Sequence, residues 1–137
     1  MEGGLQMETL IVTNPMTGET LDTLPLASKV EVQNMVDAAV SAQQVWAETP
    51  VYARAECLYR FADALEQDAE LISQLSAKDM AKPIVQARIE TMDGVKLLRA
   101  AAERAKHLYG EVLSDSGPGF EGDLVFTKRE PLGTIAC

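Results

Sequence analysis

The first apolar positions of the chain fall in two short stretches separated by turn residues. Leu10, Ile11 and Val12 form the first stretch, a turn signal follows at residues 17–18, and the second stretch runs through Leu21 and Leu24. Turn residues between two short apolar runs are typical of a β-hairpin. The pattern therefore predicts a two-stranded hairpin between residues 10 and 25.

Apolar positions then recur every three or four residues, which is the spacing of one face of an α-helix. Ser28 and Glu31 form a capping box at the start of this pattern, which predicts a helix at about residues 29–45. Three further helices are expected: one from a Thr49–Pro50 cap to about Gln67, one capped by Asp68, and a long one from Pro83 to about Tyr109. Gly110 is placed to end the last helix in a left-handed conformation.

Strand patterns return after these helices. The stretch "SDSGPGFEGD" predicts a loop, and residues 124–129 alternate as in a strand. The apolar run at residues 134–137 follows a Pro-Leu-Gly turn signal and predicts the start of a buried strand. Such a strand needs partners for its backbone groups that this sequence does not supply. The expected fold class is therefore α/β, and the expected fold is an incomplete domain.

Composition and charge narrow the classes of function. A chain of 137 residues with 47% hydrophobic and 24% charged residues has ordinary globular composition. Its formal charge of -9 argues against nucleic acid and anionic membrane surfaces as partners. There is neither a signal-peptide pattern nor an apolar run near the roughly 18 residues of a membrane span. We expect a cytoplasmic protein.

Two groups of residues match patterns that bind cofactors or cations. Gly117, Gly119 and Gly122 match G-x-G-x-x-G, but a loop precedes them and a strand follows, whereas dinucleotide binding needs a strand before and a helix after. Polar side chains also cluster at a helix junction and could bind a cation: Asp63, Glu66, Gln67, Asp68 and Glu70. A charge run of this kind usually marks a solvated helix face, which is the interpretation we favour.

Four single residues are candidates for other chemistry. Cys57 lies within a predicted helix with no local base, so we interpret it as a packing residue, and Cys137 lacks the context of a nucleophile. Both cysteines are expected to be reduced thiols. His107 is the only histidine and has no evident orienting partner, and Trp46 is expected in the core. We assign no catalytic, cofactor-binding or metal-binding residue.

Five features lie in order along most of the chain: "NPMTGE" at residues 14–19, the capped helix reaching Trp46, "KPIVQARIE" at 82–90, "YGEVL" at 109–113 and "FTKREPLGTIA" at 126–136. Together they resemble the N-terminal region of the NAD(P)-dependent aldehyde dehydrogenase superfamily. The resemblance covers the chain from about Ile11 to its end. Ala81 departs from the family, which usually has glycine before Lys-Pro. The segment "GFEGDLVFTKREPLG" is most similar to the lactaldehyde, semialdehyde and non-phosphorylating glyceraldehyde-phosphate branch.

The resemblance implies a domain organisation. Residues 1–9 would be a tail, and residues 10–137 would be the N-terminal part of the dehydrogenase fold, truncated before its cofactor and catalytic regions. The hairpin and about four helices would form a layer on the cofactor domain. Residues 124–129 would belong to an oligomerisation arm that adds to a neighbouring subunit's sheet, and the strand at residues 133–136 would begin the cofactor-binding sheet.

The resemblance also implies an activity for the full-length form. Such enzymes oxidise an aldehyde to an acid with NAD or NADP through a cysteine thiohemiacetal. Their oxyanion-binding asparagine, cysteine nucleophile, glutamate base and cofactor loop lie further downstream, so we expect this chain alone to bind no cofactor and to be inactive. Its expected partners are the rest of the dehydrogenase chain and, in the full-length form, identical subunits. Two alternatives remain open: an autonomous helical interaction module, and a small complete enzyme that uses His107 or Cys57.

Overall fold

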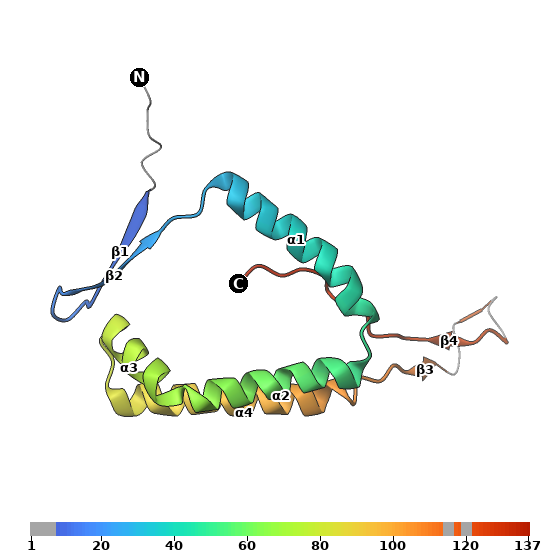
Figure 1. Ribbon diagram of the computed structural model, residues 1–137. Helices are drawn as coiled ribbons and strands as arrows, with labels where there is room; N and C mark the ends of the chain where they lie inside the picture. The colour runs from blue at the N-terminus through green and yellow to red at the C-terminus, as the bar shows by residue number, and fades with distance from the viewer. Residues whose placement is uncertain (1–7, 114–116, 119–121) are drawn as a thin grey trace, which may run out of the picture.

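A computed structural model of the chain describes residues 8–113, 117–118 and 122–137 (Figure 1). Strands β1 (Thr9–Thr13) and β2 (Thr20–Pro25) form an antiparallel hairpin. The helices are α1 (Lys29–Glu48), α2 (Val51–Gln67), α3 (Ala69–Asp79) and α4 (Ile84–Ala105). A second antiparallel pair follows, β3 (Val112–Leu113) with β4 (Val125–Phe126). This order confirms the predicted hairpin, the predicted helices and the return to strands.

The N-terminal hairpin turns on the side chain of Asn14. The backbone N–H groups of Met16 and Thr17 donate to its Oδ1 at 2.9 and 3.3 Å, and the N–H of Gly18 donates to its carbonyl at 2.8 Å. Gly18 has a φ of 74°, a conformation that glycine adopts without steric cost. The "NPMTGE" stretch is therefore a turn built by one asparagine and one glycine.

Helix α1 begins with the predicted capping box. The N–H of Glu31 donates to the Ser28 hydroxyl at 3.2 Å, and the N–H of Ser28 donates to the Glu31 carboxylate at 2.7 Å, which lowers the pKa of Glu31. The helix continues to Glu48, beyond the predicted end at residue 45. Thr49 ends it, because both its N–H and its hydroxyl donate to the Val45 carbonyl, at 3.1 and 2.9 Å. Thr49 was expected to cap α2, but Pro50 holds that position.

Helices α2 and α4 lie side by side through a seam of small residues (Figure 1). The fully buried apolar side chains are Ala55, Ala62, Ala87, Val95 and Ala102. Because alanines protrude little, the two helices can approach closely. Among the described residues, Val95 and Ser73 are the largest fully buried side chains. The two helices therefore pack closely, but their small side chains remove little apolar surface from water.

The C-terminal end of α4 differs from the prediction. The helix ends at Ala105, whereas residues up to Tyr109 were expected to be helical, and the φ of Gly110 is not positive. The reason is a close approach from a distant segment: a Cβ atom at Gly110 would collide with the Thr127 carbonyl oxygen. The N–H of Glu111 donates to the Thr127 hydroxyl, and the N–H of Thr127 donates to the Glu111 carbonyl, both at 2.8 Å. Gly110 thus allows the segment before β3 to approach the segment after β4, and it does not end the helix.

Two further strand predictions are corrected. Only Val125 and Phe126 of the predicted strand at residues 124–129 are paired, with β3 as their partner. No strand forms at residues 134–137, where Ile135 is 64% exposed. A strand needs a neighbour for its backbone N–H and C=O groups. Within the described ranges no segment pairs with residues 134–137.

Ala81 adopts a left-handed conformation between α3 and α4, with a φ of 50°. The N–H of Lys82 donates to the Ala77 carbonyl at 3.2 Å, which closes α3 with the six-residue hydrogen bond of a Schellman motif. The left-handed residue of this motif is usually glycine, because a Cβ atom there crowds the backbone. The departure seen in the sequence therefore falls on a strained position.

We predict that Ala81→Gly raises the free energy of unfolding by about 0.5–1 kcal/mol. Removing the Cβ relieves roughly 1–2 kcal/mol of left-handed strain, and the greater freedom of glycine in the unfolded chain offsets about 0.4–1 kcal/mol of that gain. Urea denaturation followed by far-UV circular dichroism measures the change. The control is Ala101→Gly on the exposed face of α4, which should lower stability by up to about 1 kcal/mol. Equal losses from both variants would contradict the assignment of strain to Ala81.

Candidate docking surface

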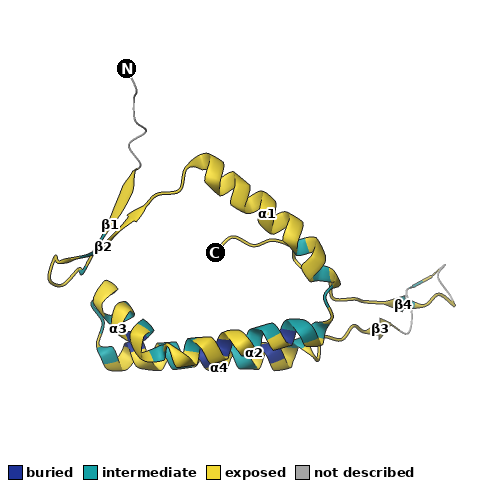
Figure 2. Cartoon of the chain, in the orientation of Figure 1, coloured by how far each residue is buried: buried dark blue, intermediate teal, exposed yellow. Residues whose placement is uncertain are grey.

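Helix α1 carries an apolar face that no other described element covers. None of its residues is buried, and it makes no extended contact with another helix or strand. Val32, Met35, Val36 and Val40 share one face, and Val36 is 46% and Met35 67% exposed. Figure 2 shows α1 as exposed over most of its length, whereas the buried residues gather among α2, α3 and α4. Of the described helices, none combines the length and apolarity needed to cross a bilayer.

The C-terminal half of this face is hollowed into an apolar pocket of about 650 Å³. Its lining residues are Ala39, Ala42, Gln43, Val45, Trp46, Thr49 and Thr134. Thr134 belongs to the C-terminal segment, which runs between α1 and the α2–α4 pair (Figure 1). Trp46 is 46% exposed, so its predicted place in a core is wrong for this chain. The tryptophan forms part of an open surface because the described residues beside it, such as Thr134, cover it only in part.

A second pocket, of about 540 Å³, lies between the N-terminal hairpin and α3. Its apolar lining comes from both elements: Val12, Leu21, Leu24, Ile72 and Leu75. We call the exposed face of α1 and these two pockets together the docking surface. Its apolar character makes it suited to burial against further protein.

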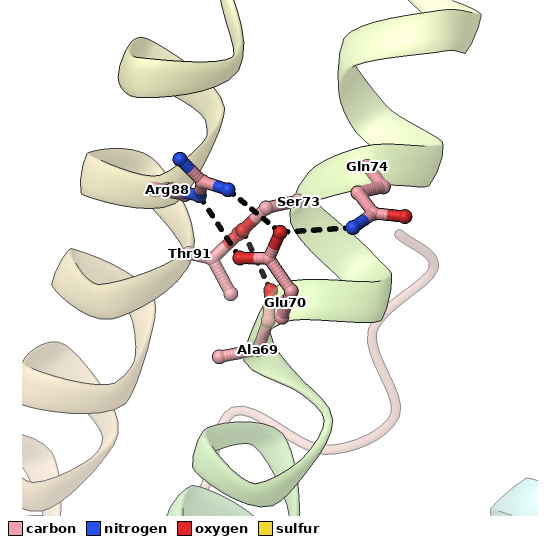
Figure 3. Close-up of polar contacts among 6 residues, drawn as sticks. All are labelled: Ala69, Glu70, Ser73, Gln74, Arg88 and Thr91. Carbon is pink, nitrogen blue, oxygen red and sulfur yellow. Dashed lines mark hydrogen bonds and ion pairs between the residues drawn. The ribbon is translucent and has the colours of Figure 1, made fainter.

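A polar clip holds α3 against α4 (Figure 3). Arg88 donates two hydrogen bonds to Glu70, at 2.9 Å from Nε and 2.7 Å from Nη2, and Gln74 donates a third at 2.9 Å. These bonds, from Arg88 first, lower the pKa of Glu70 to about 2. Beside them the buried Ser73 hydroxyl donates to the Ala69 carbonyl at 2.6 Å and lies 3.1 Å from the Thr91 hydroxyl. The clip fixes how α3 meets α4.

The predicted acidic cluster is divided between two arginines of α4. Arg99 donates to Asp63 at 2.8 Å and to Glu66 at 2.6 Å, while Glu70 belongs to the clip with Arg88. In the part of the chain that the structure describes, no group of three or more His, Cys, Asp or Glu residues is arranged to hold a metal ion. Sequence spacing could not reveal these pairs, because the partners are 18 to 36 residues apart.

The candidate nucleophiles and the histidine have other partners. Cys57 is half-buried on α2, and Arg60 donates to its sulfur at 3.1 Å. Cys137 is an exposed free thiol. His107 is exposed just after α4, with Nδ1 2.8 Å from the Tyr109 hydroxyl. None of these contacts pairs a nucleophile with a base.

The described glycines of the motif, Gly117 and Gly122, precede β4. Gly119 is outside the described residues, while Gly117 and Gly122 have φ values of 98° and 92°. Gly122 is followed by β4 and not by a helix. Pyrophosphate binding by such a motif uses the N-terminus of a following helix. Gly122 and the strand that follows it do not offer that arrangement.

Comparisons with known proteins identify relatives over nearly the whole chain. The sequence profile of the aldehyde dehydrogenase family matches residues 4–137. The chain is 33% identical over 136 residues to an NADP-dependent glyceraldehyde-3-phosphate dehydrogenase of Streptococcus equinus. It is 34% identical over 125 residues to a malonate-semialdehyde dehydrogenase of Pseudomonas aeruginosa. The solved structure of a glyceraldehyde-3-phosphate dehydrogenase from Methanocaldococcus jannaschii, complexed with NADP, aligns with a TM-score of 0.80 at 28% identity.

The chain corresponds to only part of each relative. The alignments cover 98%, 91% and 93% of this chain, but only 29%, 24% and 27% of the Streptococcus, Pseudomonas and Methanocaldococcus proteins. The chain therefore spans about a quarter of the length of the relatives that it matches. The hairpin, four helices and small second hairpin are a partial form of their fold.

We predict that Glu70→Gln removes a pH-dependent part of the stability. The pKa of Glu70 is lowered from 4.5 to about 2 in the folded chain, so the ionised clip stabilises the fold above pH 4.5 and loses its effect as the pH falls toward 2. Both side chains are about half exposed, at 52% and 54%, so the effect is modest. Urea midpoints should differ most at pH 7 and less at pH 3. A pH-independent effect of Glu70→Gln would refute the clip's role.

We predict that the isolated chain binds a hydrophobic dye through α1. Replacing both Val36 and Val40 with aspartate should lower the dye fluorescence and the tendency to aggregate, because it places two charges on the apolar face. Helicity should be kept and stability should change by less than about 0.5 kcal/mol, since both positions are exposed. The matched control, Asn34→Asp with Ser41→Asp, adds the same charge to other exposed positions of α1. Equal dye binding by both double variants would place the dye elsewhere.

Proposed function

Because the chain belongs to the aldehyde dehydrogenase family, we propose that it is the N-terminal part of an enzyme that oxidises an aldehyde to an acid with NAD or NADP. In this proposal residues 10–137 form one structural unit, and a cysteine elsewhere in the enzyme forms the thiohemiacetal. The relatives named for glyceraldehyde-3-phosphate and malonate semialdehyde support an aldehyde substrate for the whole enzyme. The NADP named in the Methanocaldococcus structure supports a nicotinamide cofactor.

The observation that carries the proposal is the surface that the chain leaves uncovered. Its accessible area is 11439 Å² for a mass of 14.9 kDa, whereas a compact monomer of that mass exposes roughly 7,000 Å². The excess of roughly 4,400 Å² is comparable to the area buried in a large obligate interface. The docking surface on α1 and beside α3 supplies apolar parts of this excess. A unit of a larger enzyme accounts for this surface, because the rest of the enzyme would cover it.

The chain on its own is proposed to be inactive. Acyl-transfer chemistry needs an activated nucleophile and preorganised donors for the oxyanion. The sulfur of Cys57 accepts a hydrogen bond from Arg60 and has no general base beside it. Cys137 is exposed and has no described partner. We therefore assign no step of the reaction, and no cofactor contact, to a residue of this chain. Its role in the enzyme would be structural.

Assembly and location are further parts of the proposal. The β3–β4 pair has two strands only, so its outer edges carry unpaired backbone groups that can accept a strand of a second subunit. This supports a homo-oligomeric enzyme. Two unpaired thiols are usual in a reducing compartment, which supports a cytoplasmic location.

A chimaera tests this function. The N-terminal part of the Streptococcus equinus enzyme that aligns with this chain is replaced by the chain itself, and solubility, cooperative melting and NADP-dependent oxidation of glyceraldehyde-3-phosphate are measured. We expect a soluble, cooperatively folded and active chimaera, because the chain replaces the hairpin and helices that were removed from the Streptococcus enzyme. The purified chain alone should not reduce NAD or NADP with either relative's substrate.

The control chimaera carries Ala55→Asp and Ala62→Asp, which place charges in the buried seam and should abolish folding. Aldehyde oxidation by the chain alone would refute the proposed inactivity. A monodisperse chain that melts cooperatively, binds no dye and fails in the chimaera would favour the alternative of an autonomous interaction module.

A further inference from the structure

The arginines of the chain fall into two groups. Four of the six donate to partners within the described residues: Arg54 to the Thr49 carbonyl at 2.7 Å, Arg60 to Cys57, Arg88 to Glu70, and Arg99 to Asp63 and Glu66. The side chains of Arg104 and Arg129 have no hydrogen bond or ion pair in this part of the chain. Both line the same surface pocket, of about 500 Å³, with His107, Leu108 and Tyr109.

The second strand pair brings these two arginines together. Arg104 lies in the last turn of α4, and Arg129 follows β4, 25 positions along the chain. The reciprocal hydrogen bonds between Glu111 and Thr127 return the chain to the end of α4. Gly110 permits this approach because it has no Cβ atom to meet Thr127. The pocket is therefore a product of the fold and not of neighbouring positions in the sequence.

His107 adds a further donor to the same pocket, and Tyr109 orients it. The Tyr109 hydroxyl lies 2.8 Å from His107 Nδ1. When the hydroxyl donates to Nδ1, the neutral imidazole carries its proton on Nε2, which is then a donor. The pocket thus combines two guanidinium groups with an imidazole N–H.

Nearby carboxylates do not neutralise the two arginines. Glu103 accepts hydrogen bonds from Lys106 and Tyr59. Glu130 lines a neighbouring pocket together with Arg54 and Arg129, but its Oε1 pairs with Lys128 at 4.0 Å and not with either arginine. The helix dipole favours Arg104 at the end of α4, but it does not explain Arg129. Two unpaired arginines in one pocket are unexpected in a chain with 21 acidic and 12 basic residues.

We propose that the pocket formed by Arg104, His107, Tyr109 and Arg129 binds a small oxyanion, a phosphate or a carboxylate group. Planar guanidinium groups bind both kinds of oxyanion with paired hydrogen bonds, and two of them facing one pocket supply the charge. Leu108 gives the pocket an apolar wall. The site is independent of the proposed dehydrogenase activity, because it uses residues of this chain alone.

The test uses the only histidine as a reporter. The imidazole resonances of His107 in the 137-residue chain are followed by NMR during titration with inorganic phosphate, and in a second arm with acetate, at fixed pH and ionic strength. We expect a saturable shift with at least one anion. Arg129→Gln and, separately, Arg104→Gln should weaken binding about tenfold, as expected for the loss of one charge-assisted pair.

Two controls separate binding from general effects of charge and folding. Lys78→Gln removes one positive charge at the end of α3 and should leave the affinity unchanged. Arg129→Lys keeps the charge and should recover part of the affinity. Saturation by phosphate alone assigns a phosphate group, and saturation by acetate alone assigns a carboxylate. A shift that never saturates, or that is the same in wild type, Arg129→Gln and Arg104→Gln, overturns the proposal.

Discussion

The close approach of α2 and α4 is the interaction on which the rest of the described structure depends. It is made by alanines and one valine, so the helices fit tightly while little apolar area leaves the solvent. At about 25 cal/mol per Å² of buried apolar surface, small side chains contribute little each. The larger apolar side chains of α1 and the hairpin are left outside this seam. The chain therefore has an ordered pair of helices and an uncovered surface for the same reason.

Ion pairs give the helical unit its orientation more than its stability. Arg99 joins α4 to α2, and Arg88 joins α4 to α3, so one helix carries both arginines that fix its neighbours. Exposed pairs of this kind contribute up to about 1 kcal/mol each. Arg88 nevertheless donates two hydrogen bonds to one carboxylate, and Arg99 bonds to two carboxylates at once. This geometry specifies the register and the angle at which the helices pack. Helix α1 has no comparable pair to another element among the described side chains, so it is joined to α2 mainly through the Arg54 hydrogen bonds to its last carbonyls.

The sequence predicted the parts of the fold that local chemistry determines. The capping box at Ser28 and the turn at residues 14–19 depend on residues a few positions apart, and both are present. The predictions that were wrong concern residues whose conformation depends on a segment far away in the sequence. Gly110 was assigned to a helix end because its partner, Thr127, is 17 positions away, and residues 134–137 were assigned to a strand for which the described chain offers no neighbour. Trp46 was placed in a core because its helix is amphipathic, although amphipathicity shows which face is apolar and not what covers it.

The same limit applies to the candidate sites. Periodicity located the apolar face of α1, and spacing located the acidic run between α2 and α3, but neither could pair that run with Arg88 and Arg99. Once those pairs are known, Asp63, Glu66 and Glu70 are accounted for as helix-to-helix contacts. Among the arginines, Arg104 and Arg129 are then left without a partner in the described part of the chain. The charged pocket at the end of α4 and the uncovered apolar surface adjoin at one point, because Arg129 also lines a neighbouring pocket with Trp46 of the docking surface. Protein that covers Trp46 would therefore also approach Arg129, whereas Arg104 and His107 line the charged pocket at the end of α4.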